Sequence, residues 1–457
     1  MKTRINLLEG NILPALSALA LPIMATSLIQ MAYNLIDMIW IGKIGASAVA
    51  SVGAAGMFMW LSNGLATLAK MGGQIKVGHA LGAQKKEDAA SYAQSSIQMG
   101  IVFAIGFGIL SIVFADEMIG FFQLNSAQVI QDAKLYLMIT CGLVIFSFMN
   151  QIFTGILTAM GNSRTSFIAT GIGLVLNIVL DPLFIFGFGA IPPMGVAGAA
   201  IATVLAQLVV MLLFLHTILR DTVLFSNVHI LHSYSSQHTM EIFRIGLPSA
   251  VQSMLFSGIS MVIARLIAGW GDAAVAVQKV GSQIESISWM TAEGYAAALN
   301  SFVAQNHGAK NTDRIREGYR LSMIVLLSWG VFCSLVLIVF PQLIFQVFIQ
   351  EAEVLPMGVD YLRILGVSQL FMCMEITTAG AFSGLGKTLP PSIVSITLTG
   401  ARIPMAILLG RWLGLNGVWW AITISSIGKG IVLLGWFLKD MKRAGMREVI
   451  IVLEFES

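Results

Sequence analysis

Two acidic residues of this chain stand inside apolar stretches, and each has polar neighbours at helical spacing. Asp37 ends a stripe of side chains spaced three or four residues apart, Ser27, Gln30, Asn34 and Asp37, and Tyr33 lies one turn before the acid. Such spacing places the stripe on one face of a helix. An acid held among apolar residues needs a partner, so the stripe predicts a surface that faces protein, water or a bound ion.

The second acid lies in the stretch LNIVLDPLF, Leu176 to Phe184. Asn177 and Asp181 are four residues apart, and Pro182 frees a backbone carbonyl one turn earlier. The next apolar run adds the hydroxyl of Thr203. Carboxylate, amide, hydroxyl and carbonyl oxygens are hard ligands that suit a proton or a small cation such as Na⁺. The alternative is a hydrogen-bonded network that only holds helices together.

The elements that position these residues are membrane-spanning helices. The chain is 57% hydrophobic and only 11% charged, and its mean hydropathy is +0.84. A spanning helix needs about 20 mostly apolar residues, and twelve runs qualify. They are 14–41, 49–78, 91–115, 133–160, 165–188, 195–218, 243–267, 273–304, 320–340, 358–383, 391–410 and 415–438. We therefore expect an all-α integral membrane protein with 12 transmembrane helices. Inserting a carboxylate at the bilayer centre costs about 2.5–3.5 kcal/mol of free energy, so the acids within these spans need a partner or a function.

Lysine and arginine residues predict the orientation of the spans. With a cytoplasmic N-terminus, sixteen of the 26 basic residues fall in cytoplasmic segments and four in external loops. This asymmetry follows the positive-inside rule. We expect both termini to be cytoplasmic.

The chain contains an internal repeat. LGAQKKEDA from Leu81 resembles HGAKNTDRI from His307, and LPIMATS from Leu21 resembles LPSAVQS from Leu247, both at an offset of 226. GVAGAAIAT from Gly195 resembles GVWWAITIS from Gly417 at an offset of 222. Six spans are an even number, so we predict two six-helix bundles related by a pseudo-two-fold axis along the membrane normal, with a cavity between them. The predicted parts are an N-lobe (1–220), a cytoplasmic linker (221–240), a C-lobe (241–440) and a cytoplasmic tail (441–457).

The two halves of the repeat differ in the positions of their charged residues but have prolines at matching positions. Ile263 takes the place of Asp37 and Ile403 that of Asp181. Within the spans of the second half, Glu285, Glu293 and Glu375 form either an ion-pair network or a functional site, and Lys70 of the first half is a candidate partner for Asp37. Prolines recur at matching places, Pro22 with Pro248 and Pro182 with Pro404, which makes them hinge candidates.

These features resemble the multidrug and toxic compound extrusion (MATE) family, in its DinF-like and archaeal branch. The resemblance rests on the two six-span repeats, the LGAQK and HGAKN turns, NIVLDP and GVAGAAIAT. It implies a secondary active transporter that exports organic cations and amphiphiles by proton or sodium antiport with alternating access. It also implies a cation site made by Asp37, Asn177, Asp181 and Thr203, with Ala199 contributing backbone, where Na⁺ is a possible metal. The implied substrate cavity is lined by Gln30, Tyr33, Asn34, Asp37 and Lys70.

The alternative function is a flippase for lipid-linked oligosaccharide or polysaccharide, which shares the architecture. A diphosphate would favour an arginine-lined cavity, whereas the N-terminal polar residues are mostly acidic. We expect no enzyme activity, since the sequence holds neither H-E-x-x-H nor G-x-S-x-G. We expect no cofactor beyond the coupling ion, no nucleic acid, and a monomer in a prokaryotic plasma membrane.

Overall fold

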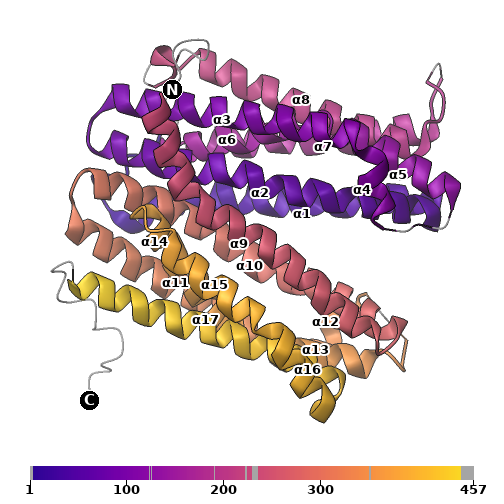
Figure 1. Cartoon of the computed structure of the whole chain (residues 1–457). Helices are drawn as coiled ribbons and strands as arrows, with labels where there is room; N and C mark the ends of the chain where they lie inside the picture. Colours follow the sequence, from indigo (N-terminus) through magenta and orange to yellow (C-terminus); the bar gives the residue numbers. More distant parts are fainter. Residues whose placement is uncertain are drawn as a thin grey trace. The chain divides into compact units, whose positions relative to one another are not determined.

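The computed structural model describes residues 4–122, 124, 126–189, 191–221, 224–228, 235–348 and 351–443. Within these ranges all regular secondary structure is helical, apart from one isolated bridge between Phe188 and Ile191 (Figure 1). The helices are α1 (Ile12–Ile44), α2 (Ala46–Gly82), α3 (Lys86–Val113), α4 (Ala115–Gly120), α5 (Ala127–Thr140), α6 (Ile145–Ala159), α7 (Arg164–Phe186), α8 (Gly195–Leu219), η1 (Phe225–Asn227), α9 (Ser236–Ala268), α10 (Asp272–Gly308), α11 (Thr312–Val339), α12 (Pro341–Gln346), α13 (Leu355–Gly366), α14 (Gln369–Gly384), α15 (Leu389–Gly400), α16 (Arg402–Leu413) and α17 (Leu415–Arg443). The all-α prediction is confirmed.

Each of the twelve predicted spans corresponds to one helix or to two consecutive helices. In the described part of the chain, nine segments are long and apolar enough to cross a membrane, with α15 and α16 counted as one. Two bent pairs, α5 with α6 and α13 with α14, raise the total to eleven, and each pair is bent by 45°. The remaining predicted span is α10, which is as long as α2 but carries more polar side chains. The three broken spans are features that the apolar runs did not reveal.

The two halves repeat element by element. α2 and α10 each have 37 residues, α3 and α11 each have 28, and α4 and α12 each have six. Left-handed backbone positions recur as well: Gln84 with φ 60° matches Lys310 with φ 56°, and Gly161 with φ 77° matches Gly386 with φ 75°. Both pairs end a helix by the same turn, because a left-handed residue lets the chain leave the helix. The predicted duplication is therefore present in the backbone.

The helices form two compact units. The first comprises Met1–Ile5 and Ala25–Ala250, and the second comprises Asn6–Met24 and Val251–Ser457. The first unit has a core of alanine, isoleucine and phenylalanine side chains from α2, α3, α5, α6 and α8. A core cluster of the second contains Tyr361 and Trp419, whose rings meet edge to face at 5.1 Å. The predicted lobes, residues 1–220 and 241–440, stay a prediction. Parts of the predicted linker (222–223 and 229–234) and most of the predicted tail (444–457) lie outside the described residues.

The segment before α1 and the first part of α1 pack with helices α10 and α11 of the second unit. Asn306 on α10 donates to the carbonyl oxygen of Leu7 at 3.0 Å. Arg314 on α11 donates to the carbonyl oxygens of Leu7, at 3.2 Å, and Gly10, at 2.8 Å. Gly294 lies directly against Met24, where a Cβ atom would come within 2.8 Å of the Met24 Cα. These contacts assign residues 6–24 to the second unit.

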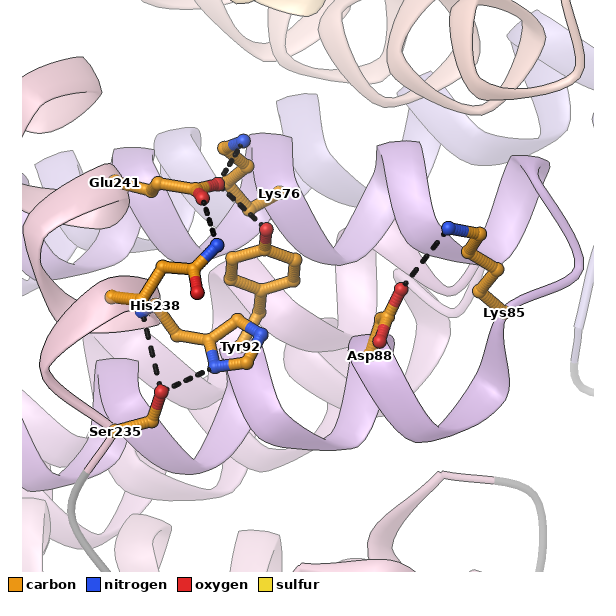
Figure 2. A network of polar contacts seen from close by, with 8 residues as sticks. Lys76, Lys85, Asp88, Tyr92, Ser235, His238 and Glu241 are labelled. Carbon is orange, nitrogen blue, oxygen red and sulfur yellow. Dashed lines mark hydrogen bonds and ion pairs between the residues drawn. The ribbon is translucent and has the colours of Figure 1, made fainter.

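The start of α9 packs in the complementary way, against α2 and α3 of the first unit. A Cβ atom on Gly246 would lie 2.1 Å from the Leu68 carbonyl oxygen, so the two helices touch backbone to backbone. Figure 2 shows the polar contacts at the same end: Glu241 pairs with Lys76 and accepts a hydrogen bond from Tyr92 Oη at 2.6 Å. The first halves of α1 and α9 are thus exchanged between the units.

The predicted hinge prolines lie close to these exchange points. Pro22 is two residues before Met24, and Pro248 is two residues before Ala250, where each helix passes from one unit to the other. The other pair is unequal: Pro182 lies inside continuous α7, whereas Pro404 follows the break between α15 and α16. The role of these prolines as hinges stays a prediction.

Candidate functional site

The polar stripe predicted on the first span lies on α1, within the first unit. Gln30 and Asn34 are exposed, whereas Tyr33 and Asp37 are partly buried. Their spacing keeps all four within one face of the helix. The inner pair, Tyr33 and Asp37, is therefore the part of the stripe that meets the other helices of the unit.

Helix α7 supplies two fully buried polar side chains. Asn177 and Asp181 are both 0% exposed, and Asn177 Nδ2 donates to Asp181 Oδ1 at 3.0 Å. Pro182 follows directly and has no backbone N–H, so the carbonyl of Ile178 loses its helical donor. This stretch therefore gathers a carboxylate, an amide oxygen and a backbone oxygen within one turn and a half of helix.

Helix α8 brings Thr203 and Ala199 to the same region. The close approach depends on small residues: a Cβ atom on Gly198 would lie 2.3 Å from the Phe184 carbonyl oxygen of α7. Ala199 is fully buried next to this contact. The Thr203 hydroxyl lies beside the Tyr33 hydroxyl of α1 without completing a hydrogen bond to it.

The predicted residues from α1, α7 and α8 are brought together by these contacts. Asp37 and Asp181 interact electrostatically, and both also act on the Tyr33 hydroxyl. Five buried oxygen atoms of this group have no hydrogen-bond partner within the described residues. They are Tyr33 Oη, Asp37 Oδ1, Asn177 Oδ1, Asp181 Oδ2 and Thr203 Oγ1. We refer to these five side chains as the oxygen cluster.

The oxygen cluster has a definite chemistry. It contains two acids, an amide and two hydroxyls, and no basic group is among its members. Buried polar atoms without partners are rare, because each one forfeits about 1–3 kcal/mol of hydrogen bonding. Two facing carboxylates also repel each other unless a positive charge lies between them. A proton, a small oxygen-seeking cation or a cationic ligand would relieve both penalties.

Two further residues bear on this site. Lys70 of α2 lies with its aliphatic stem against Gly155 of α6, and its pairing with Asp37 stays a prediction. Tyr136 of α5 is buried and interacts electrostatically with Tyr33, Asp37 and Asp181. Tyr136 was not among the predicted site residues, although a tyrosine within an apolar run is a usable signal because its hydroxyl needs a polar partner.

Among the described residues of the second unit, the positions that the repeat predicts hold no equivalent oxygen cluster. Ile263, the counterpart of Asp37, packs in an apolar cluster with Ala406 and Val418. Gln252 on α9 accepts a hydrogen bond from Ser392 Oγ at 3.0 Å. Of the acids noted in this half, Glu375 forms an ion pair with Lys429, and Glu285 accepts hydrogen bonds from Gln369 and Tyr361. Glu375 is therefore in an ion pair, and Glu285 is held by hydrogen bonds.

Known proteins are similar to this chain in sequence and in fold. The probable multidrug resistance protein NorM of Thermotoga maritima is 30% identical over 93% of this chain and 92% of its own length. The multidrug export protein MepA of Staphylococcus aureus is 22% identical, with 97% of each chain covered. A crystal structure of MATE in the straight conformation superposes with a TM-score of 0.88 at 26% identity, covering 98% of this chain and 99% of that one.

A family model matches this chain in two stretches, and they reproduce the repeat. It is described as MatE and covers residues 22–183 and 248–408. The two matches begin at Pro22 and Pro248, the paired prolines of α1 and α9. Together with apolar helices throughout, this identifies a multi-pass membrane protein that is a transporter rather than an enzyme: the chain belongs to the MatE family.

Proposed function

We propose that this chain is a secondary active multidrug efflux transporter, which exports organic cations and amphiphiles in exchange for protons or sodium ions. The oxygen cluster of α1, α7 and α8 is the observation that carries the proposal. Its two acids attract a cation in a low-dielectric setting, and its unpartnered oxygens supply ligands. The names of the NorM and MepA relatives support drug export as the task.

Coupling follows from competition for the same charge. A proton or Na⁺ entering from outside neutralises Asp37 and Asp181, and a cationic drug bound near Asp37 then loses its attraction. Each inward charge supplies about 2.3 kcal/mol at a membrane potential of 100 mV. Two ligands that exclude each other at one site are coupled, provided the site alternates between the two sides. We include Gln30 and Asn34, exposed beside the cluster on α1, in the drug-binding surface.

The direct test is efflux of a cationic dye from vesicles that contain the purified protein. A proton gradient and a sodium gradient are imposed separately, so the experiment also identifies the coupling ion. We expect one of the two to drive efflux. Equal dye movement with and without both gradients, at wild-type protein levels, would refute secondary active export.

Substrate charge gives a second test. We expect a cationic dye to be exported about tenfold faster than an anionic dye of similar size, because the acids of the oxygen cluster attract one and repel the other. Competition between the two dyes in the same vesicles measures the preference. Faster export of the anion would favour the flippase alternative and would give Lys70 the main role.

The proposed topology places both termini in the cytoplasm of a prokaryotic cell and the protein in its plasma membrane, where it acts as a monomer. Lys310, in the turn after α10, and Arg411, in the last turn of α16, are both exposed. The predicted topology puts them on opposite sides of the membrane. We expect Lys310→Cys to react with a membrane-impermeant maleimide only in inside-out vesicles, and Arg411→Cys only in intact cells. The native cysteines Cys141, Cys333 and Cys373 are buried and provide a low background. Labelling of both positions from one side would contradict the predicted span count.

A further inference from the structure

The second unit encloses two acids and two bases that lie together. Glu285 is on α10, Glu375 on α14, Arg402 on α16 and Lys429 on α17. Lys429 Nζ lies 3.0 Å from Glu375 Oε2, and Arg402 interacts electrostatically with both acids. Glu375, Arg402 and Lys429 are each less than 10% exposed. We refer to these four residues as the charge quartet.

The charge quartet is balanced, and this separates it from the oxygen cluster. With all four groups ionised, its net charge is zero. Its acids also have donors: Gln369 Nε2 donates to Glu285 Oε1 at 3.2 Å, and Tyr361 donates to Glu285 Oε2 at 3.5 Å. A buried charge without a partner costs several kcal/mol, so a balanced group is the stable arrangement. Unlike the oxygen cluster, the quartet has no charge deficit for an added cation to fill.

Arg402 lies among the three helices that correspond to those of the oxygen cluster. It stands on α16 and donates to Ser425 Oγ at 2.6 Å and Ser426 Oγ at 3.1 Å, both on α17. Its guanidinium carbon lies 5.9 Å from the ring centroid of Phe256 on α9. By the repeat, α16, α17 and α9 are the counterparts of α7, α8 and α1. At the offset of 222, Ser425 corresponds to Thr203, and the neighbour of Arg402, Ile403, corresponds to Asp181.

A second contact of the quartet also has a counterpart in the first unit, with neutral chemistry. Asn150 on α6 donates to Gln207 Oε1 on α8 at 2.8 Å. Glu375 aligns with Asn150 at an offset of 225, and Lys429 aligns with Gln207 at 222. An amide pair in the first unit is therefore replaced by an ion pair in the second. The second unit thus has a compensating pair of charges where the first unit has two neutral side chains.

We propose that the Arg402 guanidinium is a built-in cation of the second unit, held where the first unit takes up its exchangeable cation. An arginine side chain stays protonated in proteins and remains covalently attached, so it cannot be exchanged across the membrane. The transporter then has one exchangeable cation site per chain, the oxygen cluster. This inference rests on the proposed function for the meaning of that cluster, but the state of the quartet is measurable without transport.

The proposal predicts a second cation site when Arg402 is neutralised. Arg402→Met leaves two acids facing Lys429 alone, and we expect the purified full-length protein to take up one additional cation per chain. The probes are ²²Na⁺ binding and, for protons, the infrared band of a protonated carboxyl group. Arg402→Lys keeps the positive charge and should add no cation. The double variant Arg402→Met/Glu285→Gln restores the balance and should also add none.

Three results would overturn the proposal. One is a folded Arg402→Met protein that gains neither sodium nor a protonated carboxyl group. Another is an equal gain in the Arg402→Lys variant. The third applies if Arg402→Met does not fold, and it uses Glu285→Gln in the otherwise native chain. We expect this variant to bind as many cations as the wild type. Loss of a bound cation would show that the charge quartet already holds an exchangeable ion. Cation binding by Asp37→Asn, measured with the same probes, tests the oxygen cluster. Failure of the proposed function is thereby distinguished from failure of the Arg402 proposal.

Discussion

Replacement of either acid of the oxygen cluster by asparagine is expected to stop gradient-driven efflux. A carboxylate about 4 Å from a cation contributes about 4 kcal/mol at an effective dielectric constant of about 20. Its removal therefore lowers cation affinity by about two to three orders of magnitude. We expect Asp37→Asn and Asp181→Asn each to reduce dye efflux by about 100-fold in vesicles under an imposed gradient. Both variants should fold and reach the membrane, because asparagine has nearly the same shape.

The matched control for this prediction is Asn177→Ala on the same helix. Its amide oxygen is a neutral ligand that water partly replaces, so we expect a smaller loss of about tenfold, equivalent to about 1.4 kcal/mol. Efflux by Asp37→Asn at the wild-type rate would show that the carboxylate on α1 serves packing, and the coupling mechanism proposed above would have to be abandoned. Equal losses in all three variants would indicate a general structural defect.

The other large effect is expected at the contact between α7 and α8. A side chain at Gly198 meets the backbone of Phe184, which cannot rotate away as a side chain would. We expect Gly198→Leu to destabilise the first unit by about 3 kcal/mol, at the upper end of the usual overpacking penalty. It should also remove cation-driven efflux, because pushing α8 from α7 separates Thr203 from Asp181. Thermal unfolding of the purified protein and dye efflux measure the two consequences.

Gly106 on α3 provides the matched control. It lies within a spanning helix, and a Cβ atom added there meets nothing within 4 Å. Leucine is also the better helix former, by up to about 1 kcal/mol. Gly106→Leu should therefore leave stability unchanged or raise it, and efflux should persist. If the two leucine variants lose stability to the same extent, the close approach of α7 and α8 is not what holds the site.

The long helices could be predicted from the sequence, because they depend on local spacing. Apolar run length located the helices, and the four-residue spacing of Asn177 and Asp181 placed them on one helix face, where the structure has them hydrogen-bonded. The 45° bend between α5 and α6 escaped prediction, since residues 141–144 contain no proline and remain apolar. Tyr136 was missed because its contact with the oxygen cluster arises from the packing of α5, which no local pattern encodes.

The charge quartet shows the same limit for distant partners. Glu375 was noted as an acid within an apolar span, but Lys429 is 54 residues away in the sequence, and only the packing of α14 on α17 identifies them as a pair. The exchange of the helix starts was equally hidden. Pro22 and Pro248 lie within two residues of the points where α1 and α9 pass from one unit to the other. No sequence pattern indicated that the two helices change units there.

The exchanged starts of α1 and α9 have a consequence for the origin of the protein. A six-span ancestor with the same contacts could not complete its fold alone, since the beginning of its first helix would pack on a second copy. Such an ancestor would have been an obligate domain-swapped homodimer, and gene fusion would have made the swap intramolecular. Two chains made by cutting between residues 228 and 235 should accordingly be unstable when produced singly and should reconstitute efflux when produced together.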